Sequence, residues 1–329
     1  MSQIDPDFAS IPVHYADLWV NDGIIESLTH GMYTALLAVV IWQILSNITT
    51  HRWPVKVLVG ISVFMYIMAT IHLATVWFHT RRAIITKGQT EETGYLALAD
   101  WVTTVTPVWA MMINDIAAGM NIFVADGVII WRCWIIWGKN WRIIVLPCLC
   151  TIGGLIFGIS CLLQLREPMF DSQGHPKTTS TNWGLAYYVM ALPATIICTT
   201  LIVYRLAKAI KTKNSPHYAP DLYYRVIEIL VESSALYIFV QAIFIVFDAM
   251  NSPYSSYPQA VLQSVTGIAP TLMLLRVVST KDTDTGPLSD NIDSRPLQPL
   301  PRSETEGGET RVDNDEVMII GPEKMVQVV

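Results

Sequence analysis

The chain has 329 residues, of which 52% are hydrophobic and only 15% are charged. A soluble globular domain carries roughly 25% charged residues, so this composition argues against a soluble enzyme. Five cysteines are too few for a disulfide-rich scaffold. A net charge of -6 provides no basic surface for nucleic acid. The composition therefore predicts a protein whose main partner is the lipid bilayer.

The charges are distributed unevenly along the chain. From Val278 to the end there are eleven acidic and five basic residues, which accounts for the whole net charge of -6. This region is also rich in Pro, Ser, Thr and Gly, and such a segment cannot bury enough apolar surface to fold. We therefore predict a neutral, apolar body followed by a disordered acidic tail over residues 279–329.

Seven segments of the body are long and apolar enough to cross a membrane, which takes about 20 mostly apolar residues. They are Ile24–Ile48, Val55–Phe78, Val108–Trp137, Ile143–Leu165, Leu185–Ala209, Val226–Met250 and Ala260–Val278. The pattern predicts an all-α membrane protein with a seven-helix domain over residues 24–278. Residues 1–23 lack the basic start and apolar stretch of a signal peptide, so we expect a short extracellular segment there.

The positions of Lys and Arg favour one orientation, because cytoplasmic loops are enriched in these residues. Alternate loops place twelve Lys and Arg on the side of residues 205–225 and the C-terminus, and five on the other side. The N-terminus is therefore expected outside and the C-terminus in the cytoplasm, as an odd number of spans requires. No organellar signal is recognisable, so the plasma membrane is the default location of this multi-pass protein.

The third segment carries most of the polar residues within the spans, and ionisable groups there are functional candidates because they are costly in lipid. Asp115 and Asp126 are eleven residues apart, or about three turns, and share one stripe of the helix. Asn114, Asn121 and Arg132 form a second stripe roughly 100° away. We predict an intramembrane polar core containing Asp115, Asn121 and Asp126 on a helix that packs on several sides.

The sixth segment offers two carboxylates at the depth of Arg132. Glu228 and Glu232 are one turn apart on one face of the helix. A buried guanidinium suits a bidentate carboxylate partner, so we hypothesise that Arg132 contacts Glu232 or Glu228 and links the inner ends of the third and sixth helices. A static structural pair, or an intrahelical arrangement with Asp126, explains the same residues.

A second polar cluster is expected toward the outer side. Glu26 and His30 share a face of the first helix, and His72 and His79 share a face of the second. Such groups bind zinc or shuttle protons in other proteins. No HxxxH or HExxH spacing is present, which favours hydrogen-bonded histidines over a metal site. We accordingly expect no metal, no cofactor and no catalytic residue.

Several residues bear on helix packing. Pro193 and Pro270 lie deep enough to kink their helices, where neighbouring helices can satisfy the freed backbone groups. Gly154 and Gly158 form a GxxxG motif in the fourth segment. Packing inside the bundle and dimerisation explain this motif equally well, so the sequence leaves the oligomeric state open.

Two stretches resemble a family of seven-helix membrane proteins of mushroom-forming basidiomycete fungi. The first runs from Ala125-Asp126-Gly127 through Ile130-Trp131-Arg132-Cys133-Trp134 to Trp141, and the second is Gly267-Ile268-Ala269-Pro270-Thr271 with Leu275-Arg276-Val277. The resemblance covers the membrane body and implies an architecture and a lineage without a mechanism. The architecture is also similar to that of G-protein-coupled receptors, although the Asp-Arg-Tyr and NPxxY motifs of those receptors are missing.

These features lead to three functional hypotheses. The first is a receptor-like sensor whose cytoplasmic partner meets the basic inner loop at residues 205–225 and the tail. The second is a proton- or ion-coupled transporter of small molecules that uses Asp115 and Asp126. The third is a membrane metallohydrolase built on the outer His and Asp residues. The sequence shows no internal repeats, which makes the transporter hypothesis less favoured. It also lacks a metal-ligand spacing, which makes the metallohydrolase hypothesis less favoured.

Overall fold

The computed structural model describes the backbone of residues 6–46, 53–86, 106–165, 167, 182–212 and 220–284. It also describes the side chains of most of these residues. The described residues form seven α-helices and one short 3-10 helix. They are α1 (Pro6–Ser46), α2 (Trp53–Thr86), α4 (Val108–Ile136), α5 (Trp141–Gln164), α6 (Trp183–Thr212), α7 (Pro220–Ala249), η1 (Pro253–Ser255) and α8 (Ser256–Asp284).

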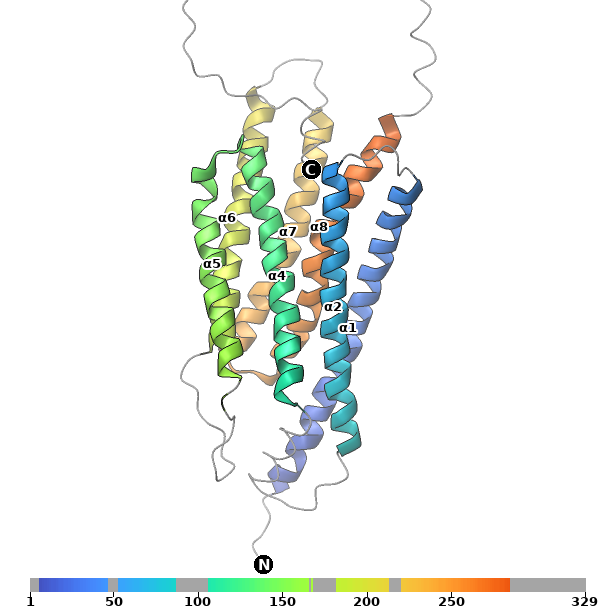
Figure 1. Cartoon of the computed structure of the whole chain (residues 1–329), viewed down its shortest axis with the longest axis vertical. Helices are drawn as coiled ribbons and strands as arrows, with labels where there is room; N and C mark the ends of the chain where they lie inside the picture. Colours follow the sequence, from blue (N-terminus) through green and yellow to red (C-terminus); the bar gives the residue numbers. More distant parts are fainter. Residues whose placement is uncertain are drawn as a thin grey trace, which may run out of the picture.

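The helices form one bundle in which each runs antiparallel to the one before it (Figure 1). Helices α1 and α8 pack against each other and close the ring, while α4 packs against α2, α5, α6 and α8. We call the end where α1 begins the amino end and the end where α8 finishes the carboxyl end. The polar third segment, α4, therefore occupies the interior position that its two stripes predicted.

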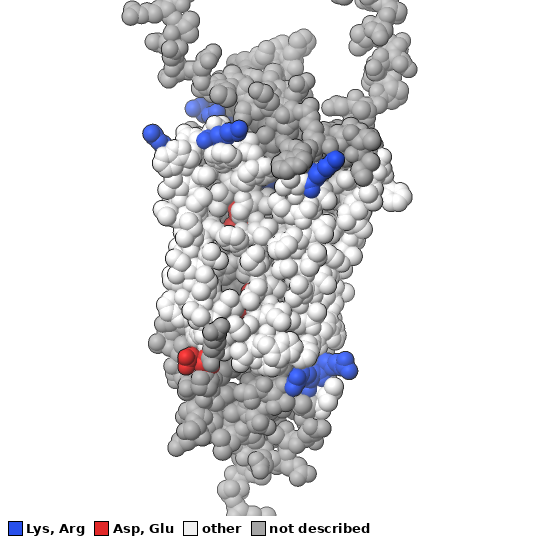
Figure 2. All heavy atoms as spheres, viewed as in Figure 1, with Lys and Arg blue, Asp and Glu red and all other residues white. Residues whose placement is uncertain are grey.

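Six of the described helices are long and apolar enough to cross a membrane. The spans are Asp17–Ser46, Val55–Ile85, Val108–Ile136, Trp141–Gln164, Trp183–Lys208 and Val231–Ala249. Helix α8 is not among them, and its buried residues include Gln263, Ser264, Thr266 and Thr271. Figure 2 shows Lys and Arg gathered near the two ends, with a largely uncharged band between them. The chain is thus a multi-pass integral membrane protein.

Several helices extend beyond the predicted spans. Helix α1 begins at Pro6, so it includes most of the segment 1–23 that was expected to precede the first span. Helix α6 continues to Thr212 and α7 begins at Pro220, so much of the expected loop 205–225 is helical. Helix α8 ends at Asp284, and the rest of the predicted tail lies outside the described residues. Polar residues near the ends extend these helices beyond their apolar centres.

Glycines set the closest approaches between helices. A Cβ on Gly158 would lie 3.6 Å from the Tyr187 ring, and Gly154 faces the same ring. The GxxxG motif of α5 therefore packs against α6 inside the bundle, the intramolecular alternative raised by the sequence. A Cβ on Gly267 of α8 would lie only 2.5 Å from the Tyr33 ring of α1. The contact that closes the ring therefore requires glycine at position 267.

Candidate functional site

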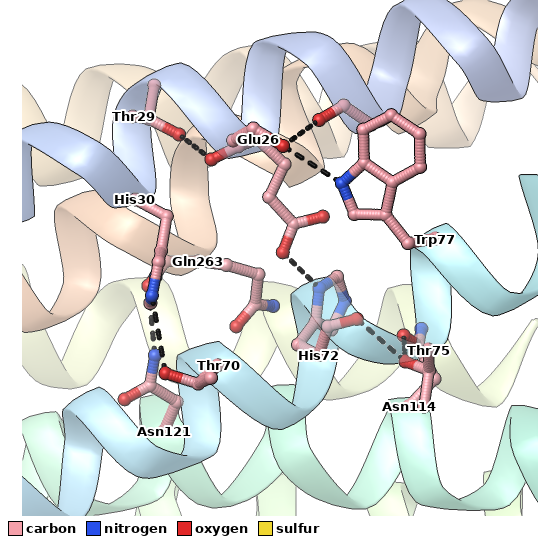
Figure 3. A network of polar contacts seen from close by, with 12 residues as sticks. Glu26, Thr29, His30, Thr70, His72, Thr75, Trp77, Asn114, Asn121 and Gln263 are labelled. Atoms are coloured by element: carbon pink, nitrogen blue, oxygen red, sulfur yellow. Dashed lines mark hydrogen bonds and ion pairs between the residues drawn. The ribbon is translucent and has the colours of Figure 1, made fainter.

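Two groups of buried polar side chains occupy the bundle interior. The first, which we call the amino-half cluster, lies between α1, α2, α4 and α8 (Figure 3). Its buried members are Asp22, Glu26, His30, His72, Thr75, Asn121 and Gln263, with the half-buried Asn114 and the exposed Thr70 at its edge. The second, which we call the central cavity, lies closer to the carboxyl end between α4, α6, α7 and α8.

A hydrogen-bonded pair of Glu26 and His72 lies at the centre of the amino-half cluster. Glu26 Oε1 lies 2.7 Å from His72 Nδ1, and the two side chains are 1% and 3% exposed. Figure 3 shows both pointing into the space between α1 and α2. Glu26 Oε2 and His72 Nε2 have no hydrogen-bond partner. The pair is therefore buried with hydrogen-bonding capacity left over, which is costly in a medium without water.

His30 is held on the same side of the cluster by α2. Its Nε2 lies 3.2 Å from Thr70 Oγ1, and its ring stacks on Tyr66 with centroids 4.9 Å apart. His79 is half-buried and packs edge-on against Phe78. Of the predicted outer cluster, the structure thus brings Glu26, His30 and His72 into the α1–α2 interface, and it places His79 in an aromatic contact of its own.

Several further members, among them Asp22, Asn114 and Gln263, were not singled out as site residues from the sequence. Asp22 is 7% exposed and its Oδ1 has no partner. It was assigned to the extracellular segment before the first span, because acidic residues such as Asp22 made that segment look too polar to belong to the first helix. Asn114 Oδ1 accepts a 2.6 Å hydrogen bond from Thr75. Both side-chain amide atoms of Gln263 lack hydrogen-bond partners among the described residues.

The amino-half cluster does not assemble a metal-ligand set. Over the part of the chain that the structure describes, no three His, Cys, Asp or Glu side chains are placed to hold one ion. Asp115, which the sequence placed in the polar core, is half-buried, and no hydrogen bond joins it to the described residues of the amino-half cluster.

The central cavity has a volume of about 60 Å³. Its wall is mostly apolar, with a carboxylate, a guanidinium and several hydroxyl groups. The lining residues are Ala125, Asp126, Val128, Ile129, Arg132, Thr195, Ser233, Ser234, Tyr237, Thr266, Ala269, Pro270 and Met273. Since four helices contribute, a shift of any one of them changes the cavity.

The two charged residues of this cavity are almost completely buried. Asp126 is 2% exposed and accepts a 3.0 Å hydrogen bond from Thr195 Oγ1. Arg132 is 3% exposed, and its Nε and Nη2 have no hydrogen-bond partner among the residues that the structure describes. No ion pair joins Arg132 to Asp126 or to any other described carboxylate. The cavity therefore holds a guanidinium that lacks the acceptors a buried charge normally requires.

The predicted contact between Arg132 and Glu232 is not formed in this structure. Glu232 is exposed, and the described residues provide no hydrogen bond or ion pair to it. The reason is the rotation of α7, because Ser233, Ser234 and Tyr237 line the cavity. Glu232 is about 100° around the helix from Ser233. The side chain of Glu228, the alternative partner, lies outside the described residues.

The amino-half cluster and the central cavity come close to each other along α4 and α8. Asn121 Nδ2 donates a 2.9 Å hydrogen bond to the Gln263 carbonyl. Asp126 and Thr266, which line the cavity, follow these residues by about one turn. Buried polar side chains therefore continue from the amino half of the bundle into the central cavity.

No protein-family model matches the chain, and no curated protein matches it either. The buried polar geometry is therefore the basis of the functional proposal.

Proposed function

We propose that the protein is a receptor-like sensor with seven membrane spans. In this proposal α8 is the seventh span, the N-terminus is outside and the C-terminus is cytoplasmic. The excess of Lys and Arg on the carboxyl-end side supports this orientation. A cytoplasmic signalling partner would bind at residues 205–225 and the tail. The expected lack of enzymatic activity belongs to the same proposal.

The observation that carries the proposal is a pair of opposite charges that have no ionic partner among the described residues. Arg132 is buried in the central cavity with unsatisfied N–H groups. Glu232 is exposed on the adjacent helix, next in sequence to the cavity residue Ser233. An uncompensated buried cation is strongly unfavourable, and a carboxylate in a membrane span is also costly. Both costs fall if α7 rotates so that the two side chains meet.

Such a rotation gives the bundle two states. In the described state α7 presents Ser233 and Tyr237 to the cavity. In the second state Glu232, or Glu228 one turn earlier, pairs with Arg132. The central cavity leaves α7 room to turn, because a packed core without space resists such a shift. A ligand that prefers one state changes the population of both, which is how a receptor signals.

The test is basal guanine-nucleotide exchange on fungal Gα subunits co-expressed with the protein. We assign the described, unpaired state to signalling. Glu232→Gln and Arg132→Gln then each raise basal exchange, because each removes the pairing that stabilises the silent state. Glu228→Gln reports whether that residue shares the role. Glu167→Gln neutralises an exposed glutamate at the amino end and serves as the matched control.

Unchanged exchange in all variants, accompanied only by altered thermal stability, overturns the receptor proposal. The continuous polar interior then favours proton- or ion-coupled transport. That reading requires substrate flux in reconstituted vesicles that disappears in Asp126→Asn.

A further inference from the structure

The Arg132 guanidinium lacks an acceptor where it meets the central cavity. It lines the cavity from α4, is 3% exposed and has two unsatisfied nitrogens, Nε and Nη2. Buried guanidinium groups are normally satisfied by carboxylates or other anionic oxygens. The described residues around this cavity supply no such group within hydrogen-bonding distance of Arg132.

Other donors line the same cavity. Tyr237 is 4% exposed and its hydroxyl has no hydrogen-bond partner. The Ser234 side chain also lines the wall. Asp126 is the carboxylate of the cavity, and it accepts from Thr195 without approaching Arg132 to ion-pair distance. The Arg132 nitrogens Nε and Nη2 and the Tyr237 hydroxyl are therefore donors at this cavity that have no partner among the described residues.

We infer that the central cavity binds a small monovalent anion, held by Arg132 with the hydroxyl of Tyr237. Its volume of about 60 Å³ leaves room for a few water-sized groups, since about 10–15 Å³ of such space holds one water molecule. A halide or a one-carbon carboxylate fits in this space. Binding of such an anion requires no signalling activity, so it stands apart from the proposed function.

Asp126 predicts that two substitutions in this cavity change the anion affinity in opposite directions. It lies six residues before Arg132 on α4, which is about 9 Å along the helix axis. A carboxylate in the same poorly solvated space opposes a second negative charge. Neutralising Asp126 should therefore strengthen anion binding, while neutralising Arg132 should weaken it. A merely structural role for the two residues gives no such opposition.

The experiment measures thermal unfolding of the purified, full-length protein in lipid nanodiscs. Chloride, bromide or formate replaces gluconate at constant ionic strength. The wild type should show a Tm that rises and then saturates with the small anion, because a ligand that binds only the folded state stabilises it by mass action. Arg132→Gln should weaken binding by about 10- to 100-fold, the loss expected for charge-assisted hydrogen bonds. Asp126→Asn should bind several-fold more tightly.

Arg142→Gln is the matched control, since Arg142 is an exposed cation at the carboxyl end of the bundle. It should retain the wild-type response. Arg132→Gln itself should fold well without the anion, because it removes an unpaired buried charge. A Tm that is insensitive to these anions, or a rise of equal size in Arg132→Gln, would overturn the inference. Weaker binding in Asp126→Asn would also contradict it.

Discussion

At the scale of single residues, the bundle buries polar groups that a membrane interior cannot hydrate. Glu26 and His72 satisfy one another across α1 and α2 at 2.7 Å, while Glu26 Oε2 and His72 Nε2 remain without partners. Removing one partner from such a pair is much more harmful than removing both, because the survivor is left uncompensated. The pair therefore couples the first two helices.

This coupling predicts a non-additive pair of substitutions. His72→Leu should lower the free energy of unfolding by about 3–5 kcal/mol, since Glu26 would be buried alone. The double variant with Glu26→Leu should recover much of that loss. The measurement is unfolding in detergent for both single variants and the double variant, with His79→Leu as a less buried histidine control. Losses that simply add would show that the two side chains act independently.

The sequence indicated some of these residues and could not indicate others. Glu26, His30, Asp126 and Arg132 stood out because charge and histidine are rare in apolar helices. Gln263 carries no charge and did not stand out. The contact between Arg132 and Glu232 is not formed in the described state for another reason. Spacing along α7 places Glu232 at the right depth, but the rotation of a helix depends on packing against its neighbours.

At the scale of helices, glycine positions distinguish close contacts from ordinary ones. Gly267 allows α8 to approach α1 so closely that a methyl group would overlap the buried Tyr33 ring. Tyr33 cannot move aside easily, since it is fully buried and its hydroxyl donates to the Ser62 carbonyl at 3.1 Å. Gly158 has a looser fit, with the Tyr187 ring at 3.6 Å from an added Cβ.

Two alanine substitutions should consequently differ. Gly267→Ala should destabilise the protein by about 1–3 kcal/mol, the usual cost of overpacking. Gly158→Ala should be tolerated, because an added Cβ there meets ordinary van der Waals contact. Thermal unfolding of both variants checks this, and Tyr33→Leu in the Gly267→Ala background should restore part of the loss. Equal Tm values for the two alanine variants would mean that the α1–α8 contact is looser than described.

At the scale of the whole molecule, composition was enough to predict a multi-pass helical membrane protein. Six described helices have the length and apolarity of spans. The seventh predicted span forms helix α8, whose buried face carries Gln263, Ser264 and Thr266. Those same polar residues lower its apolarity and line the bundle interior. Length and hydropathy thus locate the helices, whereas their mutual rotation arises only when all of them pack together.

The central claim is that α7 turns to bring Glu232 to Arg132 in a second state of the bundle. The most direct measurement exchanges the two charges and reads basal nucleotide exchange on Gα. Arg132→Glu and Glu232→Arg should each raise exchange, and the double variant should return it toward the wild-type value, because the reversed charges can pair again. A double variant no closer to wild type than either single variant would contradict the pairing and the two-state account built on it.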